Sequence, residues 1–249
     1  MINLAIFVSG GGSNCENIIR YFKDSDKVNV ALVVANKTGI PALEKAERLG
    51  VPTRVLPKAD LNREDVVLPL MKEYSIDFIV LAGFLLVIPD FLIHEYDHRM
   101  INLHPALLPK FGGMGMYGHH VHEAVKAAGE TETGMTVHWV SGKVDSGGII
   151  AQFRTPISPD DTPDDIAAKE HALEMEHFPQ VIEALADNAL IINLKNGFVV
   201  QPATPRHCFL HSYSISCVPR PSSFAAKKEE GAGKGLVESR LIGVSDRNA

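Results

Sequence analysis

Apolar runs alternate with amphipathic stretches along the first 190 residues. Three runs are apolar at nearly every position, which is typical of strands buried on both faces: Leu4–Val8, Val28–Val34 and Asp77–Ala82. Thr53–Leu56 predicts a shorter strand. Helices are expected between the strands: Ser13–Phe22, Pro41–Leu49 and Arg63–Tyr74. Because helices separate the strands, the pattern predicts βαβ crossovers and a mainly parallel, Rossmann-like α/β sheet with helices on both faces.

The pattern changes towards residue 190. Thr136–Ser141 and Ile149–Thr155 predict two strands, and the loop between them is too short for a crossover helix. We therefore expect antiparallel strands near the C-terminal part of the sheet. Thr162–Asp187 predicts a long acidic helix, in which Pro179 is a position where a kink can form.

The composition divides the chain into two parts. Residues 1–200 carry 17 Lys+Arg and 26 Asp+Glu, a net charge of −9, whereas residues 201–249 carry 7 and 4, a net charge of +3; together they give −6. The second part contains several prolines and a glycine-rich run but no apolar period. We predict a catalytic domain at residues 1–190 and an irregular, flexible tail at 191–249, whose composition suggests a readthrough or frameshifted extension.

Charge and cysteine content narrow the function classes. An acidic chain with a pI near 6.0 argues against a general nucleic-acid or anionic-membrane surface. No apolar run approaches the roughly 20 residues of a membrane span, and the N-terminus lacks the basic start of a secretory signal. Three widely spaced cysteines predict neither a disulfide framework nor a zinc site. A reducing cytoplasm fits this composition best.

The turn Ser9-Gly10-Gly11-Gly12-Ser13-Asn14 follows the first strand and begins the first helix. Glycines let backbone N–H groups approach an anion, and a helix N-terminus favours negative charge, so this turn is a candidate phosphate site. It lacks the third glycine of the dinucleotide fingerprint and the Gly-Lys-Ser/Thr of a Walker loop. A tight turn without a ligand is the alternative.

Asn102 and His104 are two residues apart in an extended segment, so their side chains face the same side. An amide donor beside an imidazole suits a carbonyl that develops negative charge. Pro105 disfavours a helix at His104, and Pro109 stiffens the loop. A histidine that only makes structural hydrogen bonds is the alternative.

Asp145 lies in the glycine-containing loop Val144–Ile149. If the loop folds over the sheet edge, the carboxylate orients His104 and favours the imidazolium form. The loop taken alone is equally consistent with a plain turn.

Three histidines occur within four residues, at His119, His120 and His122. On a helix these positions do not share a face, and they lack the i, i+4 spacing of a two-histidine helical metal site. We therefore predict no metal.

These motifs, in this order and spacing, resemble the phosphoribosylglycinamide formyltransferases. Further similarity lies in Leu81–Phe84, Lys110–Gly113 and Gly134–His138. The resemblance covers roughly residues 1–188 and ends at the predicted tail. It implies a formyltransferase fold and an enzyme of de novo purine (IMP) biosynthesis. The implied reaction transfers the formyl group of 10-formyltetrahydrofolate to the amine of N1-(5-phospho-D-ribosyl)glycinamide.

The resemblance also implies roles for residues of this chain. Asn102, His104 and Asp145 correspond to the catalytic trio; Gly12, Ser13 and Asn14 to the phosphate site; and Glu174 to a contact with the glycinamide substrate. The folate is expected against two segments: Leu85, Leu86, Val87 and Ile88, and Val140, Ser141, Gly142, Lys143 and Val144. No partner beyond the two substrates is implied, and the oligomeric state stays open.

Two positions depart from the family pattern. Met114 stands where close relatives often carry lysine, and Leu86 where some members have arginine. Each change removes a cation near an anionic ligand, so we expect it to alter affinity more than the reaction.

Other formyl-folate enzymes and a non-catalytic nucleotide-binding module are the alternatives. A formyltetrahydrofolate deformylase is expected to carry an N-terminal regulatory domain before the first strand. A methionyl-tRNA formyltransferase is expected to carry a structured basic C-terminal domain, whereas residues 191–249 are patternless. The complete trio argues against a module that has lost its chemistry.

Overall fold

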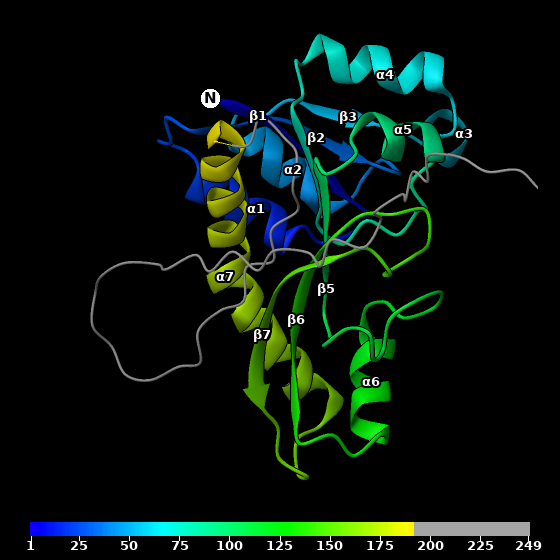
Figure 1. Cartoon of the computed structure of the whole chain (residues 1–249), viewed down its shortest axis with the longest axis vertical. Coiled ribbons are helices and arrows are strands. Elements are labelled where there is room, and N and C mark those ends of the chain that lie inside the picture. The colour runs from blue at the N-terminus through cyan, green and yellow to red at the C-terminus, as the bar shows by residue number, and fades with distance from the viewer. Residues whose placement is uncertain (192–249) are drawn as a thin grey trace, which may run out of the picture. The chain divides into compact units, whose positions relative to one another are not determined.

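A computed structural model describes residues 1–191 of the chain, and all of them belong to one compact unit. Their seven strands form one mixed sheet in the order β3-β2-β1-β4-β5-β6-β7 (Figure 1). The strands are β1 (Ile2–Val8), β2 (Val28–Ala35), β3 (Thr53–Val55), β4 (Phe78–Leu81), β5 (Met100–His104), β6 (Glu132–Trp139) and β7 (Ile149–Pro156). The tail predicted at 191–249 lies, beyond Ile191, outside the described residues.

Helices connect the parallel strands and cover the sheet (Figure 1). They are α1 (Ser13–Tyr21), α2 (Pro41–Arg48), α3 (Lys58–Leu61), α4 (Glu64–Glu73), α5 (Asp90–Glu95), α6 (His119–Ala127) and α7 (Pro163–Ile191). Strands β1 to β5 pair in parallel, whereas β6 pairs antiparallel with both β5 and β7. The predicted parallel sheet with antiparallel strands near its C-terminal part is confirmed.

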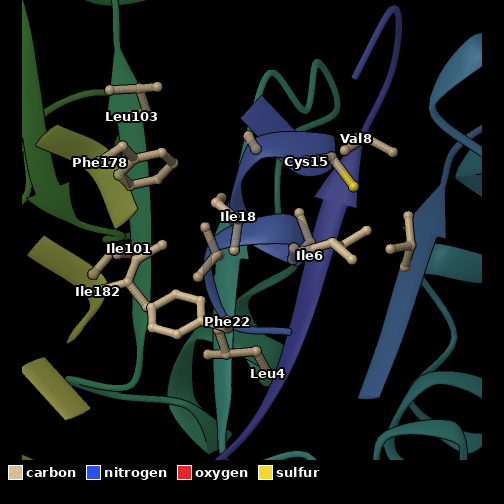
Figure 2. Packing of buried hydrophobic residues seen from close by; sticks show 14 of the residues in the cluster. Leu4, Ile6, Val8, Cys15, Ile18, Phe22, Ile101, Leu103, Phe178 and Ile182 are labelled. Atoms are coloured by element: carbon tan, nitrogen blue, oxygen red, sulfur yellow. The ribbon is translucent and has the colours of Figure 1, made fainter. Parts of the chain in front are cut away.

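Successive side chains of β1 point to opposite faces of the sheet. Leu4, Ile6 and Val8 pack with α1, α2 and α7 in one buried cluster (Figure 2), whereas Ala5 and Phe7 pack with α3, α4 and α5 in a second. All five residues are almost fully buried. A strand that is covered on both faces needs apolar residues at consecutive positions. The helices on both faces of the sheet therefore explain the continuous apolar run in the sequence.

Several elements differ from the prediction. The short helices α3 and α5 were not predicted, and α7 continues through Pro179. Strand β6 begins at Glu132, four residues before its expected start. A Cβ on Gly134 would lie 1.9 Å from the Phe153 carbonyl oxygen. This glycine therefore permits a close approach of β7 and lies within the strand, although glycine usually weakens strands.

The strand order reverses direction between β1 and β4. From β1 the chain runs outwards through β2 and β3, and it then returns to β4 on the other side and continues to β5. Ligands of open α/β sheets bind at such a point, beyond the carboxyl ends of the strands. The loops after β1 and β4 are joined here, because the Ser9 N–H donates to the Gly83 carbonyl (3.1 Å) and the Leu85 N–H to Ser9 Oγ (2.9 Å). The residues predicted to hold the substrates lie around this point.

Among residues 1–191 no helix is both long and apolar enough to cross a membrane.

Candidate active site

A cavity of about 530 Å³ lies at the carboxyl edge of the sheet. Its walls come from the loop after β4, the end of β5, the glycine-rich loop before α6, the β6–β7 loop and one face of α7. Small-molecule sites commonly measure about 300–1,000 Å³. The cavity therefore has the size of a substrate site, and it lies where the strand order predicts one.

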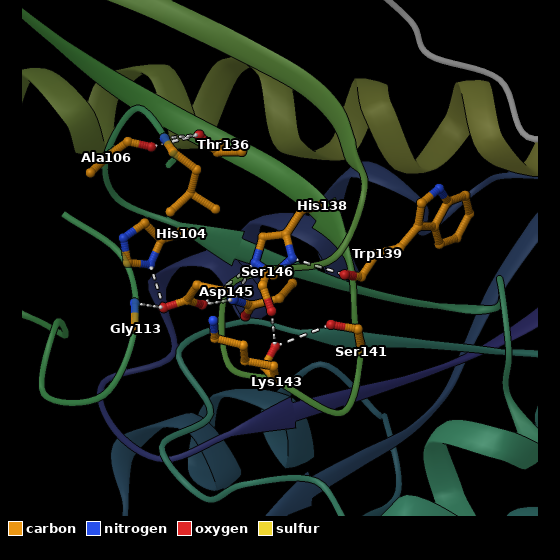
Figure 3. A network of polar contacts seen from close by, with 12 residues as sticks. His104, Ala106, Gly113, Thr136, His138, Trp139, Ser141, Lys143, Asp145 and Ser146 are labelled. Atoms are coloured by element: carbon orange, nitrogen blue, oxygen red, sulfur yellow. Dashed lines mark hydrogen bonds and ion pairs between the residues drawn. The ribbon is translucent and has the colours of Figure 1, made fainter. Parts of the chain in front are cut away.

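The structure brings together the three side chains predicted as catalytic; Figure 3 shows two of them, His104 and Asp145. Asn102 and His104 project from the end of β5, and the β6–β7 loop places Asp145 against both. Asn102 Nδ2 lies 3.4 Å from Asp145 Oδ1, and His104 Nδ1 lies 3.6 Å from Asp145 Oδ2. The His104 and Asp145 side chains are 4% and 8% exposed, so their electrostatic interaction is little screened by water.

His138 is a fourth member of this group, and no role was predicted for it. It lies opposite Asn102 in the β5–β6 pair, and its Nε2 is 3.1 Å from Asn102 Nδ2 and 3.6 Å from Asp145 Oδ1. Its Nδ1 lies 2.9 Å from the Trp139 carbonyl oxygen (Figure 3). Donation from Nδ1 to that carbonyl leaves Nε2 of the neutral ring to accept from Asn102. The available signal in the sequence was a histidine between two apolar residues, Val137 and Trp139, within a predicted strand.

The segment after Pro109 is hydrogen-bonded to two members of the trio. His104 Nε2 lies 2.7 Å from the Phe111 carbonyl oxygen, and the Gly113 N–H donates to Asp145 Oδ2 at 2.9 Å. A carbonyl only accepts, so His104 donates from Nε2. Phe111 holds this position with φ of 56°, which is uncommon for a residue with a side chain. The glycine-rich wall of the cavity therefore depends on both His104 and Asp145.

Burial controls the charge of His104. Burial lowers the pKa of His104 below its ordinary value of 6.5, although Asp145 and the Phe111 carbonyl act in the opposite direction. Burial alone would raise the pKa of Asp145, but the nearby His138 and His104 rings and the hydrogen bond from the Gly113 N–H outweigh it and hold the pKa below 3.8. Asp145 favours the imidazolium as predicted, but its effect is smaller than that of burial. The balance of these effects favours the neutral imidazole of His104 beside the Asp145 carboxylate, whereas the imidazolium form was expected from the sequence.

The lowered pKa of His104 predicts a dependence of stability on pH. Just below pH 6.5 the unfolded chain binds a proton at His104 that the folded chain does not, so the free energy of unfolding rises with pH up to about 6.5. We expect the free energy of unfolding of the His104→Asn variant to rise less steeply with pH in this range, because the contribution of His104 is missing. Urea unfolding of both proteins between about pH 5 and pH 7.5 measures it. Identical slopes would show that the pKa of His104 is not lowered.

The predicted phosphate turn lies beside the cavity and contacts its lining. Asn14 Nδ2 donates to Glu174 Oε2 at 2.9 Å, and Glu174 lines the cavity. Gly12 has φ of 71°, and a Cβ there would lie 2.5 Å from the Ala42 Cβ, so only glycine fits where α2 approaches the turn. Gly12, Ser13 and Asn14 are not part of the cavity lining itself. The structure thus joins the turn to the predicted substrate residue through one hydrogen bond.

His171 also contacts Glu174 and was not predicted as a site residue. Its Nδ1 lies 3.2 Å from Glu174 Oε2, and this carboxylate raises the pKa of His171. The spacing of three residues places both side chains on the same face of α7. Glu174 therefore favours the imidazolium form of a partly exposed histidine that shares its carboxylate with Asn14 of the predicted phosphate turn.

Both segments predicted to hold a folate line the cavity: Leu85–Ile88 after β4, and Val140–Val144 in the β6–β7 loop. Leu85 and Val87 are 56% and 58% exposed, which is high for apolar side chains, and exposed apolar surface in a cavity marks a binding surface. Met114 is 80% exposed and also lines the cavity. An apolar wall opposite a loop that offers backbone polar groups fits a flat heteroaromatic ring.

The three clustered histidines lie on α6. His119 and His120 are exposed, whereas His122 is buried and points to Glu170. Within the part of the chain that the structure describes, no group of three or more His, Cys, Asp or Glu side chains is arranged to hold a metal ion.

A family model described as formyl transferase matches residues 2–182. The chain belongs to this family. All residues that line the cavity lie within the matched range, the last being Glu174. The family match therefore covers the whole cavity lining, and it ends inside α7.

Curated relatives carry more specific names. A chloroplastic phosphoribosylglycinamide formyltransferase of Arabidopsis thaliana is 38% identical over 193 residues, which cover 75% of this chain and 66% of that protein. The phosphoribosylglycinamide formyltransferase of Escherichia coli is 34% identical over 194 residues, which cover 76% of this chain and 89% of that protein. This formyl transferase thus spans less than two thirds of the plant proteins, 62% in Vigna unguiculata.

Solved structures that resemble this chain carry the same protein name as these relatives. The crystal structure of phosphoribosylglycinamide formyltransferase from Bacillus halodurans is 33% identical, with a TM-score of 0.68. The match covers 75% of this chain and 96% of that chain. The formyl transferase fold predicted from the motifs is therefore confirmed by structures of the same kind.

Proposed function

We propose that this formyl transferase transfers the formyl group of 10-formyltetrahydrofolate to the amine of N1-(5-phospho-D-ribosyl)glycinamide, a step of de novo purine biosynthesis. The names of the relatives support the reaction and the pathway. One observation of the structure carries the proposal. Asn102, Asp145 and the buried His104 line a cavity whose walls also contain the apolar segment Leu85–Ile88 and the carboxylate of Glu174.

Asn102 serves as the donor to the developing oxyanion. Attack of the substrate amine on the formyl carbon places negative charge on the formyl oxygen. Asn102 Nδ2 carries two hydrogens. One is directed to His138 Nε2 at 3.1 Å, and the other to Asp145 Oδ1 at the longer distance of 3.4 Å. The second, weaker contact can be exchanged for the oxyanion without breaking the first.

His104 serves as the proton acceptor. Its neutral resting state leaves it able to take the proton that the amine loses, directly or through a water molecule, and to return it to the leaving folate nitrogen. The imidazolium formed in between is stabilised at both nitrogens, by Asp145 and by the Phe111 carbonyl. The proton lost by the amine is the proton gained by the folate, so no metal and no covalent enzyme intermediate are needed.

The remaining predicted residues bind the two substrates. Gly12, Ser13 and Asn14 hold the phosphate with backbone N–H groups and the positive end of α1. Glu174 contacts the glycinamide part, and its hydrogen bond to Asn14 supports this arrangement. Leu85–Ile88 and Val140–Val144 enclose the folate, which supplies the activated formyl carbon when bound. Holding both substrates in line supplies much of the rate enhancement.

We propose residues 1–190 as the catalytic domain, because every cavity-lining residue lies within them. A chain truncated after residue 195 should keep kcat/KM within about twofold of the full chain, because it retains every cavity-lining residue. Steady-state kinetics of the two purified proteins measures this. A truncated protein that folds, by circular dichroism, but is inactive would contradict the boundary.

We also propose a cytoplasmic location, which a chain with few cysteines fits. The name of the Arabidopsis relative places that protein in the chloroplast.

The reaction is tested by incubating the full chain with glycinamide ribonucleotide and 10-formyltetrahydrofolate and following tetrahydrofolate by absorbance. We expect turnover that requires both substrates. Turnover with water alone would indicate a deformylase, and binding without turnover would indicate a nucleotide-binding module.

A further inference from the structure

A second buried polar group lines the cavity, apart from the trio. It consists of His122 of α6, Thr133 of β6 and Glu170 of α7, which are 8%, 2% and 1% exposed. His122 Nδ1 lies 2.6 Å from Glu170 Oε2, and the Thr133 hydroxyl donates to Glu170 Oε1. One carboxylate thus joins three elements, and both His122 and Glu170 face the cavity.

Stability alone does not account for this group. Burial raises the pKa of Glu170, and contacts with His122 and Thr133 act against the rise. His122 Nδ1 and Glu170 Oε2 are 2.6 Å apart, although the geometry between them is not that of a well-directed hydrogen bond. Buried polar pairs of this kind often stabilise a protein no more than apolar side chains of the same volume.

The pair lies between two parts of the proposed substrate site. His122 is in the first turn of α6, directly after the Gly113–Gly118 wall of the cavity. Glu170 precedes Glu174 by one turn of α7, so the two carboxylates share a helix face. Apolar contacts of Val121 and Ile166 already attach α6 to α7. The polar pair adds direction to this attachment, because a close contact between two polar atoms constrains the position of the first turn more narrowly than apolar contact does.

Resting on the proposed function, we propose that Glu170 and His122 are positioning residues for the ribonucleotide. The pair fixes the first turn of α6, and with it the Gly113–Gly118 wall, relative to Glu174. The bound ribonucleotide then lies with its amine aligned towards the trio. Without the pair, α6 remains packed on α7, but the wall of the cavity shifts and the ribonucleotide binds less tightly.

Three variants separate positioning from stability: Glu170→Leu, the double variant His122→Leu/Glu170→Leu, and Glu170→Gln. Each is measured by urea unfolding, by calorimetric titration with glycinamide ribonucleotide, and by turnover. Glu170→Leu leaves the buried imidazole without its partner, so we expect lower stability and about tenfold weaker binding. The double variant should recover stability while binding stays about tenfold weaker. Glu170→Gln keeps oxygen and nitrogen atoms at the carboxylate position, and we expect binding within about threefold of the wild type.

The control is Asp187→Asn, which breaks the exposed ion pair of Asp187 with Lys27 (2.8 Å) and should leave binding unchanged. If the double variant recovers binding together with stability, the pair is only structural and the proposal is wrong. The titration does not depend on turnover. A wild type that binds the ribonucleotide without turnover contradicts the proposed reaction but still tests the pair, whereas a wild type that does not bind it overturns the pair's role as well.

Discussion

The His104→Ala and Asn102→Ala variants should each lose at least about 100-fold in kcat. Removing an oxyanion donor such as Asn102 usually costs about 100- to 1,000-fold, and removing a general base such as His104 about 100- to 10,000-fold. His104 takes up the proton of the amine, and Asn102 donates to the formyl oxygen. The loss should appear at saturating concentrations of both substrates, because these contacts strengthen only in the transition state. Steady-state rates of tetrahydrofolate release measure it.

The matched control is His120→Ala, which removes an exposed imidazole from α6 outside the cavity lining. It should keep kcat within about twofold, as surface substitutions usually do. His104 is buried, so thermal unfolding of each variant shows whether lost activity reflects lost structure. Residues that act as a unit have non-additive effects. The loss of kcat in the Asn102→Ala/His104→Ala double variant can therefore be smaller than the product of the two single losses. Near-normal turnover of that double variant would refute the assignment.

The Asp145→Asn variant should lower kcat by about 100-fold or more; loss of the carboxylate that orients a catalytic histidine can lower kcat by about 10⁴. Asp145 contacts His104 at 3.6 Å and accepts from the Gly113 N–H at 2.9 Å. An amide in its place removes the charge that stabilises the imidazolium. It can also place an NH2 group against the Gly113 N–H, which loosens the glycine-rich wall.

The same variant makes a prediction about pH. Asp145 acts to raise the pKa of His104, so its neutralisation should lower that pKa further. If the neutral imidazole is the active form, kcat/KM falls on the acid side as His104 is protonated. This acid limb should therefore move to lower pH in Asp145→Asn. An unchanged kcat, or an acid limb that moves to higher pH, would contradict the role given to Asp145.

The layered fold could be predicted because the residue pattern of a single strand shows whether one or both of its faces are buried. Leu4–Val8 is apolar at every position, and the structure buries alternate residues against helices on opposite faces. Asn102 and His104 could be predicted to lie together because they share a face of β5. Placing Asp145 beside them required the loop to fold over the sheet edge, which periodicity does not specify. The sequence therefore indicated this contact only as a condition, and the family resemblance supported it.

Other features depend on contacts between distant segments. Gly134 lies inside β6 because β7 approaches it closely, and a local pattern contains no sign of that neighbour. His138 became part of the trio's network only through the antiparallel register of β5 and β6. Glu170 is one of many acidic residues in the sequence of α7, but it is almost fully buried because His122 and Thr133 lie opposite. The neutral state of His104 likewise follows from burial, which outweighs the nearby carboxylate.

The most direct test of the account is transfer of an isotopically labelled formyl group. The full chain is mixed with 10-formyltetrahydrofolate labelled in the formyl carbon and with glycinamide ribonucleotide, and the products are identified by mass spectrometry. We predict one labelled N-formyl ribonucleotide for each tetrahydrofolate released, and neither product when the ribonucleotide is omitted. Labelled formate in place of labelled ribonucleotide, or release of tetrahydrofolate without the ribonucleotide, would contradict the account.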